Sequence, residues 1–317
     1  MRSLFFLVFL AAAFLAIGAI GLVQADPPAK QATEGDATEA AAQDKPNSDA
    51  TSEEAPQYLR LAKTEAGKPS ALQTAIVRYV GKPDSQYAGQ EVDLVGVVHI
   101  GERDYYEELN DRLATYDTVL YELVAPDGTR IKPEDLEKRR SILASMQSGM
   151  KDMLNLEYQL ERVDYMVKNF RHADMSPTEF AEDLERRGDS LFKMFARMMG
   201  AGLASSAATG GDAGLMIALL SGEDRPKMMK QAMARQLVDV ELVTAGIDDE
   251  NGENTLIKGR NAKAFQILKA ELDEGSDKVA VFYGAGHLPD MAERLEKDFG
   301  MKAVGSEWFD AWDLTRN

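Results

Sequence analysis

The stretch that decides the fold is VDLVGVVHIGERDYYEELNDRLATYDTVLYELV, which runs from Val92 to Val124. It begins with a near-continuous apolar run, typical of a strand that is buried on both faces of a parallel sheet. This run ends at His99, and Gly101 follows at the turn. Apolar residues then recur at helical spacing, and a second apolar run stops at Glu122. The stretch therefore predicts a strand, an amphipathic helix and a second strand.

The two polar residues of this unit occupy equivalent positions. His99 and Glu122 each follow the carboxyl end of a predicted strand. In open α/β sheets, ligands bind at that edge of the sheet. The sequence thus predicts that an imidazole and a carboxylate face a common binding site.

A second unit of the same kind, strand, Gly-x-x-His and helix, lies near the C-terminus. The apolar run Lys278–Tyr283 is followed by Gly284-Ala285-Gly286-His287, and Pro289 begins a predicted helix. The chain has three histidines, so two of them in the same strand-end context point to a shared site. The structural alternative is that each of these histidines caps a helix or bonds a neighbouring strand.

Four short motifs occur in order along the chain: Gly96-Val97-Val98-His99, Tyr121-Glu122-Leu123, Lys258-Gly259-Arg260-Asn261 and Gly284-Ala285-Gly286-His287. In these residues the chain resembles the TraB/PrgY/GumN superfamily, which includes the TIKI metalloproteases and is distantly similar to erythromycin-esterase-type hydrolases. The resemblance spans Val92 to the C-terminus. It implies a divalent-metal-dependent hydrolase core, as in some members, whereas many other members have no known activity. The long middle region is not constrained by these motifs.

The N-terminus, residues 1–25, has the features of a signal peptide. Arg2 supplies a positive charge, Leu4 to Val23 is apolar, and Val23-Gln24-Ala25 matches a small-residue cleavage site. We expect cleavage after Ala25 and an exported protein, either periplasmic or secreted. The alternative is an uncleaved membrane anchor, because the apolar run is long enough to span a bilayer. Residues 26–56 are acidic and poor in large apolar side chains, which predicts a disordered linker.

Composition restricts the classes of partner. The formal net charge of −17 argues against nucleic acid and against anionic lipid. Because the chain contains no cysteine, an exported domain of this size must be stabilised by its core or by a metal. We expect no stable membrane insertion once the leader is removed.

Residues 57–317 are predicted to form one α/β domain. We expect a mainly parallel sheet with antiparallel edge strands, and a large helical insertion at about 133–243. Within the insertion, Ser176-Pro177-Thr178-Glu179 is a capping box that starts a helix. The Met-, Gly- and Ala-rich segment 191–220 predicts either apolar helices packed on the sheet or a lid over the His–Glu edge.

Both ends of this domain are expected to contribute strands. Alternating apolar residues between Tyr58 and Tyr79 favour an antiparallel pair at the edge of the sheet. At the other end we expect a short strand at Met301–Val304. Trp308 and Trp312 then stand at helical spacing and are expected to close the core.

The polar residues at the predicted strand ends match the ligand set of a hydrolytic metal site. Two neutral imidazoles and a carboxylate leave one position of a divalent metal open for water. We therefore expect His99, His287 and Glu122 to converge on a divalent metal ion, with Glu122 either a ligand or the base. Arg260 either stabilises an oxyanion or pairs with Glu122, and its structural alternative is a surface salt bridge. His172 is either a third imidazole ligand or a residue of a surface loop.

The predicted function is an extracytoplasmic metal-dependent hydrolase, similar to a peptidase, which acts on a peptide or a small ester. One alternative is a metal-independent esterase-like hydrolase in which His99 or His287 is the general base. The other is a non-catalytic protein that binds an exported peptide in the same cleft. The joint presence of two histidines, a glutamate and an arginine argues against pure binding, which seldom needs that set.

Overall fold

A computed structural model describes residues 57–131, 154, 156–190, 192–193, 225–244, 248 and 252–316. The predicted signal peptide, the predicted linker and nearly all of the segment 191–220 lie outside the described residues. None of the helices in these ranges is both long and apolar enough to cross a bilayer.

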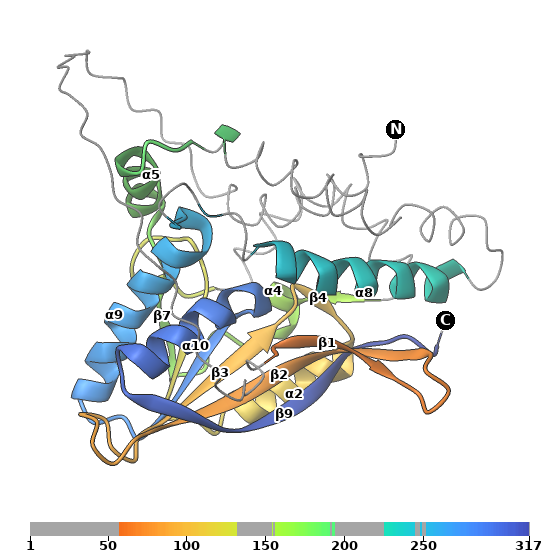
Figure 1. The fold of residues 1–317 in the computed structure, drawn as a ribbon, viewed down its shortest axis with the longest axis horizontal. Helices are drawn as coiled ribbons and strands as arrows, with labels where there is room; N and C mark the ends of the chain where they lie inside the picture. Colours follow the sequence, from red (N-terminus) through yellow and green to blue (C-terminus); the bar gives the residue numbers. More distant parts are fainter. Residues whose placement is uncertain are drawn as a thin grey trace, which may run out of the picture.

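A mixed sheet, seven-stranded when counted within the described ranges, forms the centre of the domain (Figure 1). Its main path, in spatial order, is β1 (Leu59–Lys63), β2 (Pro69–Gly81), β3 (Glu91–Val97), β8 (Lys278–Gly284), β5 (Thr118–Tyr121) and β7 (Phe170–His172). Strands β3, β8, β5 and β7 run parallel, whereas β1 and β2 are antiparallel to their neighbours. The α/β class, with a parallel centre and antiparallel edge strands, is therefore confirmed.

The helix between β3 and β5 sets the strand order at the functional edge. This helix, α2 (Arg103–Leu113), carries the chain from β3 over to β5, so that β8 lies between them. In β3 every residue after Glu91 is buried, which explains the continuous apolar run in the sequence. The carboxyl ends of β3, β8 and β5 are consequently adjacent.

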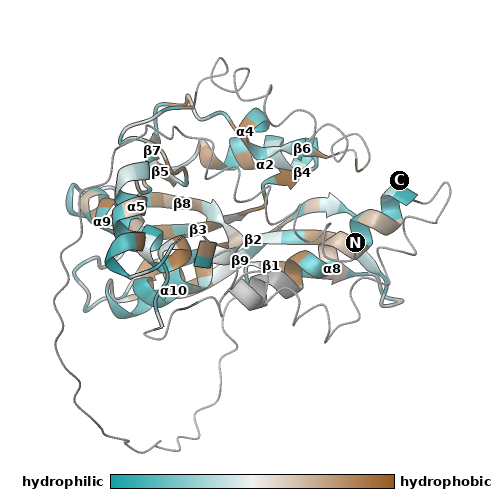
Figure 2. Cartoon of the chain, turned by 90° about the horizontal axis from the view of Figure 1, so that it is seen from above, coloured by the Kyte–Doolittle hydropathy of each residue, from teal (hydrophilic) through white to brown (hydrophobic). Residues whose placement is uncertain are grey.

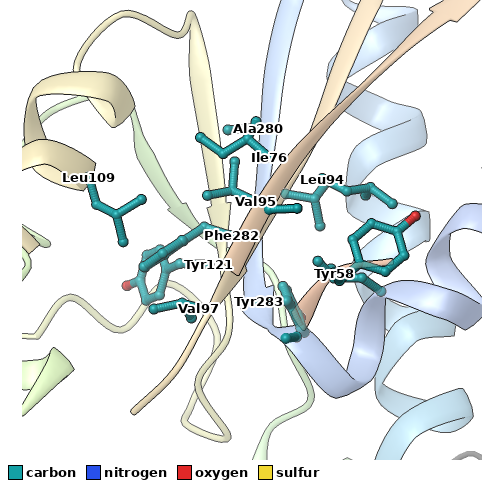
Figure 3. Close-up of a cluster of buried hydrophobic side chains, with 14 of the residues drawn as sticks. Tyr58, Ile76, Leu94, Val95, Val97, Leu109, Tyr121, Ala280, Phe282 and Tyr283 are labelled. Atoms are coloured by element: carbon teal, nitrogen blue, oxygen red, sulfur yellow. The ribbon is translucent and has the colours of Figure 1, made fainter. Parts of the chain in front are cut away.

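Helices cover both faces of the sheet. In Figure 2, α2 lies on one side of the sheet and α10 (Leu288–Lys297) on the other. The helix α9 (Arg260–Asp273) leads into β8 and contacts β5. Figure 3 shows the core between these layers: Leu109 of α2 lies to one side of the strands and Tyr58 to the other, and both are buried.

In the described part of the region 133–243, helices alternate with short strands. It contains α4 (Gln159–Arg162), α5 (Pro177–Arg186) and α8 (Arg225–Thr244). The predicted capping box at the start of α5 is confirmed, because the Ser176 side chain accepts from the Glu179 N–H. However, β7 joins the main sheet, and β6 (Glu157–Tyr158) pairs with β4 (Ile100–Gly101). Strands of two or three residues are too short to produce a visible alternation in the sequence.

The C-terminal strand is longer than the sequence suggested. β9 (Met301–Asp313) pairs with β2 and contains both tryptophans, so their helical spacing was misleading. Trp308 pairs with Ala75 and Trp312 with Leu72, and the register shifts between these pairs. A bulge of this kind inserts one extra residue and disturbs the two-residue period of a strand. Trp312 is fully buried, as expected, and its indole donates to the Ile100 carbonyl at 2.7 Å.

Candidate functional site

Three of the predicted site residues lie at neighbouring strand ends. His99 follows β3 by two residues, Glu122 comes directly after β5, and His287 ends a 3₁₀ turn (Ala285–His287) that follows β8. Because β8 lies between β3 and β5, the side chains come from adjacent parallel strands. This edge is the ligand-binding edge of an open α/β sheet.

Gly284 marks the point at which these side chains converge. A Cβ atom built on Gly284 would lie 3.3 Å from Oε2 of Glu122, 3.9 Å from Nε2 of His99 and 3.9 Å from Cδ2 of His287. Because glycine has no side chain, the space that a Cβ would take beside Gly284, here called the hollow, is bordered by these three side chains. The backbone N–H of Gly284 also donates to Oε2 of Glu122 at 2.8 Å.

Glu122 is held as a carboxylate by its surroundings. Its Oε1 accepts a hydrogen bond of 2.6 Å from Nη2 of Arg260 and lies 3.5 Å from Nε2 of His287. Burial raises the pKa of Glu122, but the nearby Arg260 charge, the two imidazoles and the Gly284 N–H together outweigh it. The pKa of Glu122 is therefore held well below its usual range, and the side chain is ionised at neutral pH.

Arg260 bridges two buried carboxylates. Its Nε and Nη2 donate to Asp174 at 3.0 and 2.6 Å, and Nη2 also donates to Glu122. Arg260 is 2% exposed and Asp174 is fully buried. Burial lowers the pKa of Arg260, but the two carboxylates more than offset this and raise it above its usual range. The surface salt bridge that was the structural alternative for Arg260 is therefore wrong, because the ion pairs are buried and the one with Asp174 is bidentate.

Asp174 is a site residue that the sequence did not reveal. It lies two residues after β7, which is the fourth parallel strand of the sheet, and so belongs to the same edge as the other groups. The signal that could have identified it is again a polar residue after a strand. That signal was hidden because β7 has only three residues.

His287 is buried and has a defined tautomer. Its Nδ1 lies 2.7 Å from Oδ1 of Asn261, while the Asn261 amide group donates to the His287 carbonyl and to Asp290. Because both of those partners can only accept, Oδ1 of Asn261 must face the imidazole, and Nδ1 of His287 carries the proton. Burial, together with the charge of Arg260, lowers the pKa of His287 to about 3 in spite of Glu122. Its Nε2 is therefore an unprotonated acceptor, 3.4 Å from Nη1 of Arg260.

His99 is exposed, in contrast to His287. Its Nδ1 lies 2.9 Å from Oε1 of Gln159, and the Gln159 amide group donates to the hydroxyl of Tyr165 at 2.9 Å. Its Nε2 faces the hollow at Gly284. Gln159 also escaped the sequence analysis, because it comes from a segment 60 residues away along the chain.

His172 has a structural role in this arrangement. Its Nε2 lies 2.6 Å from the carbonyl oxygen of Leu123, which can only accept, so Nε2 carries the proton. Its ring packs edge-on against Tyr121. Nε2 of His172 is thus committed to the backbone that follows Glu122, and it positions this segment.

The turn before α9 explains the motif Lys258-Gly259-Arg260-Asn261. Residues Thr255–Gly259 form a π-helical turn, a geometry that is frequent at functional sites. A Cβ on Gly259 would lie 2.7 Å from Oδ2 of Asp183, so only glycine permits this close approach. Asp183 in turn accepts from Thr255 at 2.7 Å. The glycine therefore lets α5 hold the turn that delivers Arg260 and Asn261 to the site.

The predicted metal ligands are present, but they do not form a ligand set in this arrangement. Within the described ranges, no three His, Asp or Glu side chains are placed to hold a metal ion. The physical reason is Arg260, whose guanidinium already contacts both Glu122 and Nε2 of His287. A fixed cation in that position would repel a divalent metal ion.

Comparisons with known proteins add no family assignment. No protein-family model matches the chain, and neither a curated protein nor a solved structure shows significant similarity to it. The resemblance to the TraB/PrgY/GumN superfamily therefore stays a prediction that rests on the four motifs.

Proposed function

We propose that the protein is a hydrolase that cleaves an ester or peptide bond by general-base catalysis, with His99 as the base. The observation that supports this most directly is the hollow at Gly284, around which Nε2 of His99, Oε2 of Glu122 and the His287 ring all lie within 4 Å of one point. A water molecule held between Nε2 of His99 and Oε2 of Glu122 would have the two hydrogen-bonding partners that it needs. The substrate would be a peptide or a small ester, as expected from the sequence.

In the proposed reaction, a water molecule in the hollow transfers a proton to Nε2 of His99. The water oxygen adds at the same time to the carbonyl carbon of the substrate. When the tetrahedral intermediate collapses, the C–O or C–N bond breaks. The proton on Nε2 then passes to the leaving alcohol or amine, and His99 returns to its neutral form.

The buried charges beside His99 support this role. Asp174, Arg260 and Glu122 together carry one net negative charge, and Glu122 is the member that faces the imidazoles. A carboxylate near an imidazole stabilises the imidazolium that forms when the base takes a proton. Of the two roles expected for Arg260, the contacts favour pairing with Glu122, because both N–H groups of Nη2 are directed to carboxylates.

A divalent metal ion is the second candidate, and one specific observation favours it. Both imidazoles bond an amide oxygen through Nδ1, and metal-binding histidines usually have such a partner on the second nitrogen. His99, His287 and Glu122 would hold the ion, which would supply an activated water molecule. This candidate requires Arg260 to withdraw from Glu122 and His287.

The experiment compares hydrolysis of p-nitrophenyl butyrate and of a mixture of quenched fluorescent peptides by the wild type and by Gly284→Ala. The backbone of Gly284, with φ −50° and ψ 135°, accepts alanine. The added methyl group would lie 3.3 Å from Oε2 of Glu122, so it fills the hollow and crowds that carboxylate. We expect kcat/KM to fall by about 100-fold. The matched control is Gly305→Ala, because a Cβ at Gly305 meets no atom within 4 Å.

Chelation separates the two candidates. General-base hydrolysis by His99 predicts that EDTA leaves the rate unchanged. A rate that EDTA abolishes and a divalent metal restores would establish the second candidate instead. Full activity of Gly284→Ala, or a wild type that binds the peptides without cleaving them, would contradict the hydrolase proposal and favour the non-catalytic alternative.

A further inference from the structure

One short segment holds His99 from several directions. Glu157–Tyr158 pairs with Ile100–Gly101, the two residues that directly follow His99. The next residue, Gln159, donates its backbone N–H to the His99 carbonyl at 3.0 Å. Its side-chain Oε1 lies 2.9 Å from Nδ1 of the same histidine. Three consecutive residues from the predicted insertion thus fix both the backbone and the ring of His99.

We propose that Gln159 is a positioning residue that holds His99 in its Nδ1–H tautomer and so leaves Nε2 unprotonated. A neutral imidazole carries one proton, and the hydrogen bond at one nitrogen decides which nitrogen carries it. An amide oxygen at Nδ1 can only accept, so it selects the tautomer in which Nδ1 is protonated. The catalytic consequence rests on the proposed function, in which Nε2 of His99 takes the proton of water.

The orientation of the Gln159 amide is linked to its contact with Tyr165. Gln159 is 5% exposed, and its NH₂ group donates to the hydroxyl of Tyr165, which is 2% exposed. With the NH₂ group directed to Tyr165, the opposite end of the amide, Oε1, faces His99.

The same device occurs at His287, where the oxygen of Asn261 selects the Nδ1–H tautomer. The two amides differ in how firmly they are oriented. The NH₂ group of Asn261 donates to two groups that can only accept, whereas that of Gln159 donates to a hydroxyl, which can also donate. Gln159 is therefore the position at which a substitution can change the tautomer of a site histidine.

The test is ¹⁵N NMR of the full-length chain with labelled histidine, recorded at alkaline pH. The three histidines are assigned by comparison with His99→Gln and His287→Gln. We expect a protonated Nδ1 and an unprotonated Nε2 for His99 in the wild type. In Gln159→Leu, which has no acceptor, we expect the protonated population of Nε2 to rise. Gln159→Glu, an acceptor only, should restore the Nδ1–H tautomer.

Kinetics with p-nitrophenyl butyrate provide the second readout. Gln159→Leu should lower kcat by about tenfold with little change in KM. Gln159→Glu should recover most of kcat, because its carboxylate can accept from Nδ1 of His99 as the amide oxygen does. The other ionisable groups facing His99 are Glu122 and His287, which these variants leave in place.

Gln90→Leu is the matched control, because Gln90 is a partly buried glutamine whose NH₂ group bonds two carbonyls outside the site. It should change neither the tautomer nor kcat. A wild-type His99 with its proton on Nε2, or an unchanged tautomer in Gln159→Leu, would overturn the proposal. If the tautomers are as expected but no substrate is cleaved, the positioning role stands and the proposed hydrolase function fails.

Discussion

The two Gly-x-x-His turns share a sequence pattern but differ in their surroundings. Each imidazole follows a parallel strand and bonds an amide oxygen through Nδ1. His287 is 5% exposed, lies beside Arg260 and has a pKa lowered to about 3. His99 is exposed, and its amide partner comes from the insertion rather than from the helix that leads into the same turn.

This difference teaches that a repeated motif does not imply a repeated role. A buried imidazole that stays neutral contributes a fixed acceptor to the site. An exposed imidazole beside Gly284 can exchange protons with water and with a substrate. Under the proposed function, the chemistry would belong to His99 and the organisation of the buried charges to His287.

The strongest test of these different roles for His99 and His287 is to remove each imidazole separately. His99→Gln should lower kcat for p-nitrophenyl butyrate by about 10²- to 10⁴-fold, the usual range for loss of a general base. Its free energy of unfolding should change by less than ~1 kcal/mol, because the side chain is exposed. His287→Gln should instead lower stability measurably. Equal losses of stability in the two variants, measured by urea unfolding, would contradict the comparison.

The buried charges beside His287 depend on Arg260. Arg260→Met should lower the free energy of unfolding by about 3–5 kcal/mol, because it leaves the Asp174 and Glu122 carboxylates without their cation. Adding Asp174→Asn to this variant should recover part of the loss, since one uncompensated charge is then removed. Urea unfolding of the single and double variants measures both effects. Additive losses would mean that the ion pair is not coupled as its geometry indicates.

The lowered pKa of His287 predicts loss of stability in acid. Its pKa falls from 6.5 to about 3 on folding, so between these values the unfolded chain binds a proton that the folded chain excludes. Stability should therefore fall as the pH falls from about 6.5 toward 3, by on the order of 4 kcal/mol. Glu122 acts in the same direction below about pH 4.5, because its pKa is also lowered on folding.

His287→Gln isolates this contribution. Urea unfolding of the variant should show a weaker dependence of stability on pH than the wild type between about pH 6.5 and 4.5, where Glu122 is still ionised in both states. Parallel curves for the two proteins would show that His287 is not neutral in the folded state.

The smallest effect is expected at the third histidine, which serves as a reference for the other two. His172→Gln should cost about 1 kcal/mol of stability, the typical contribution of one hydrogen bond, here to the Leu123 carbonyl. We expect kcat to change by less than about threefold, a barrier change of ~0.6 kcal/mol, because His172 bonds the backbone and not a reacting group. A loss of activity as large as that of His99→Gln would place His172 in the reaction and restore it as a predicted ligand.

The sequence by itself determined the α/β class and three strand ends of the site. Buried parallel strands need apolar side chains on both faces, so they are visible as continuous apolar runs that stop at His99, Glu122 and the turn before His287. The parallel direction of these strands then places their ends together. One helix start was also readable, because Ser176 caps a helical turn through local hydrogen bonds.

Only the tertiary structure decided the partners of these residues. Gln159, Asp174 and Arg260 reach the site from segments 60 to 138 residues away from their partners along the chain, and β7 is too short to have a period. The tryptophans of β9 are four residues apart, a spacing that fits a helix and a strand alike, and only the pairing of β9 with β2 decides between them. Sequence periodicity reports which face of an element is buried. It does not report which distant charge or amide will lie against a given side chain, and at this site those neighbours distinguish the exposed histidine from the buried one.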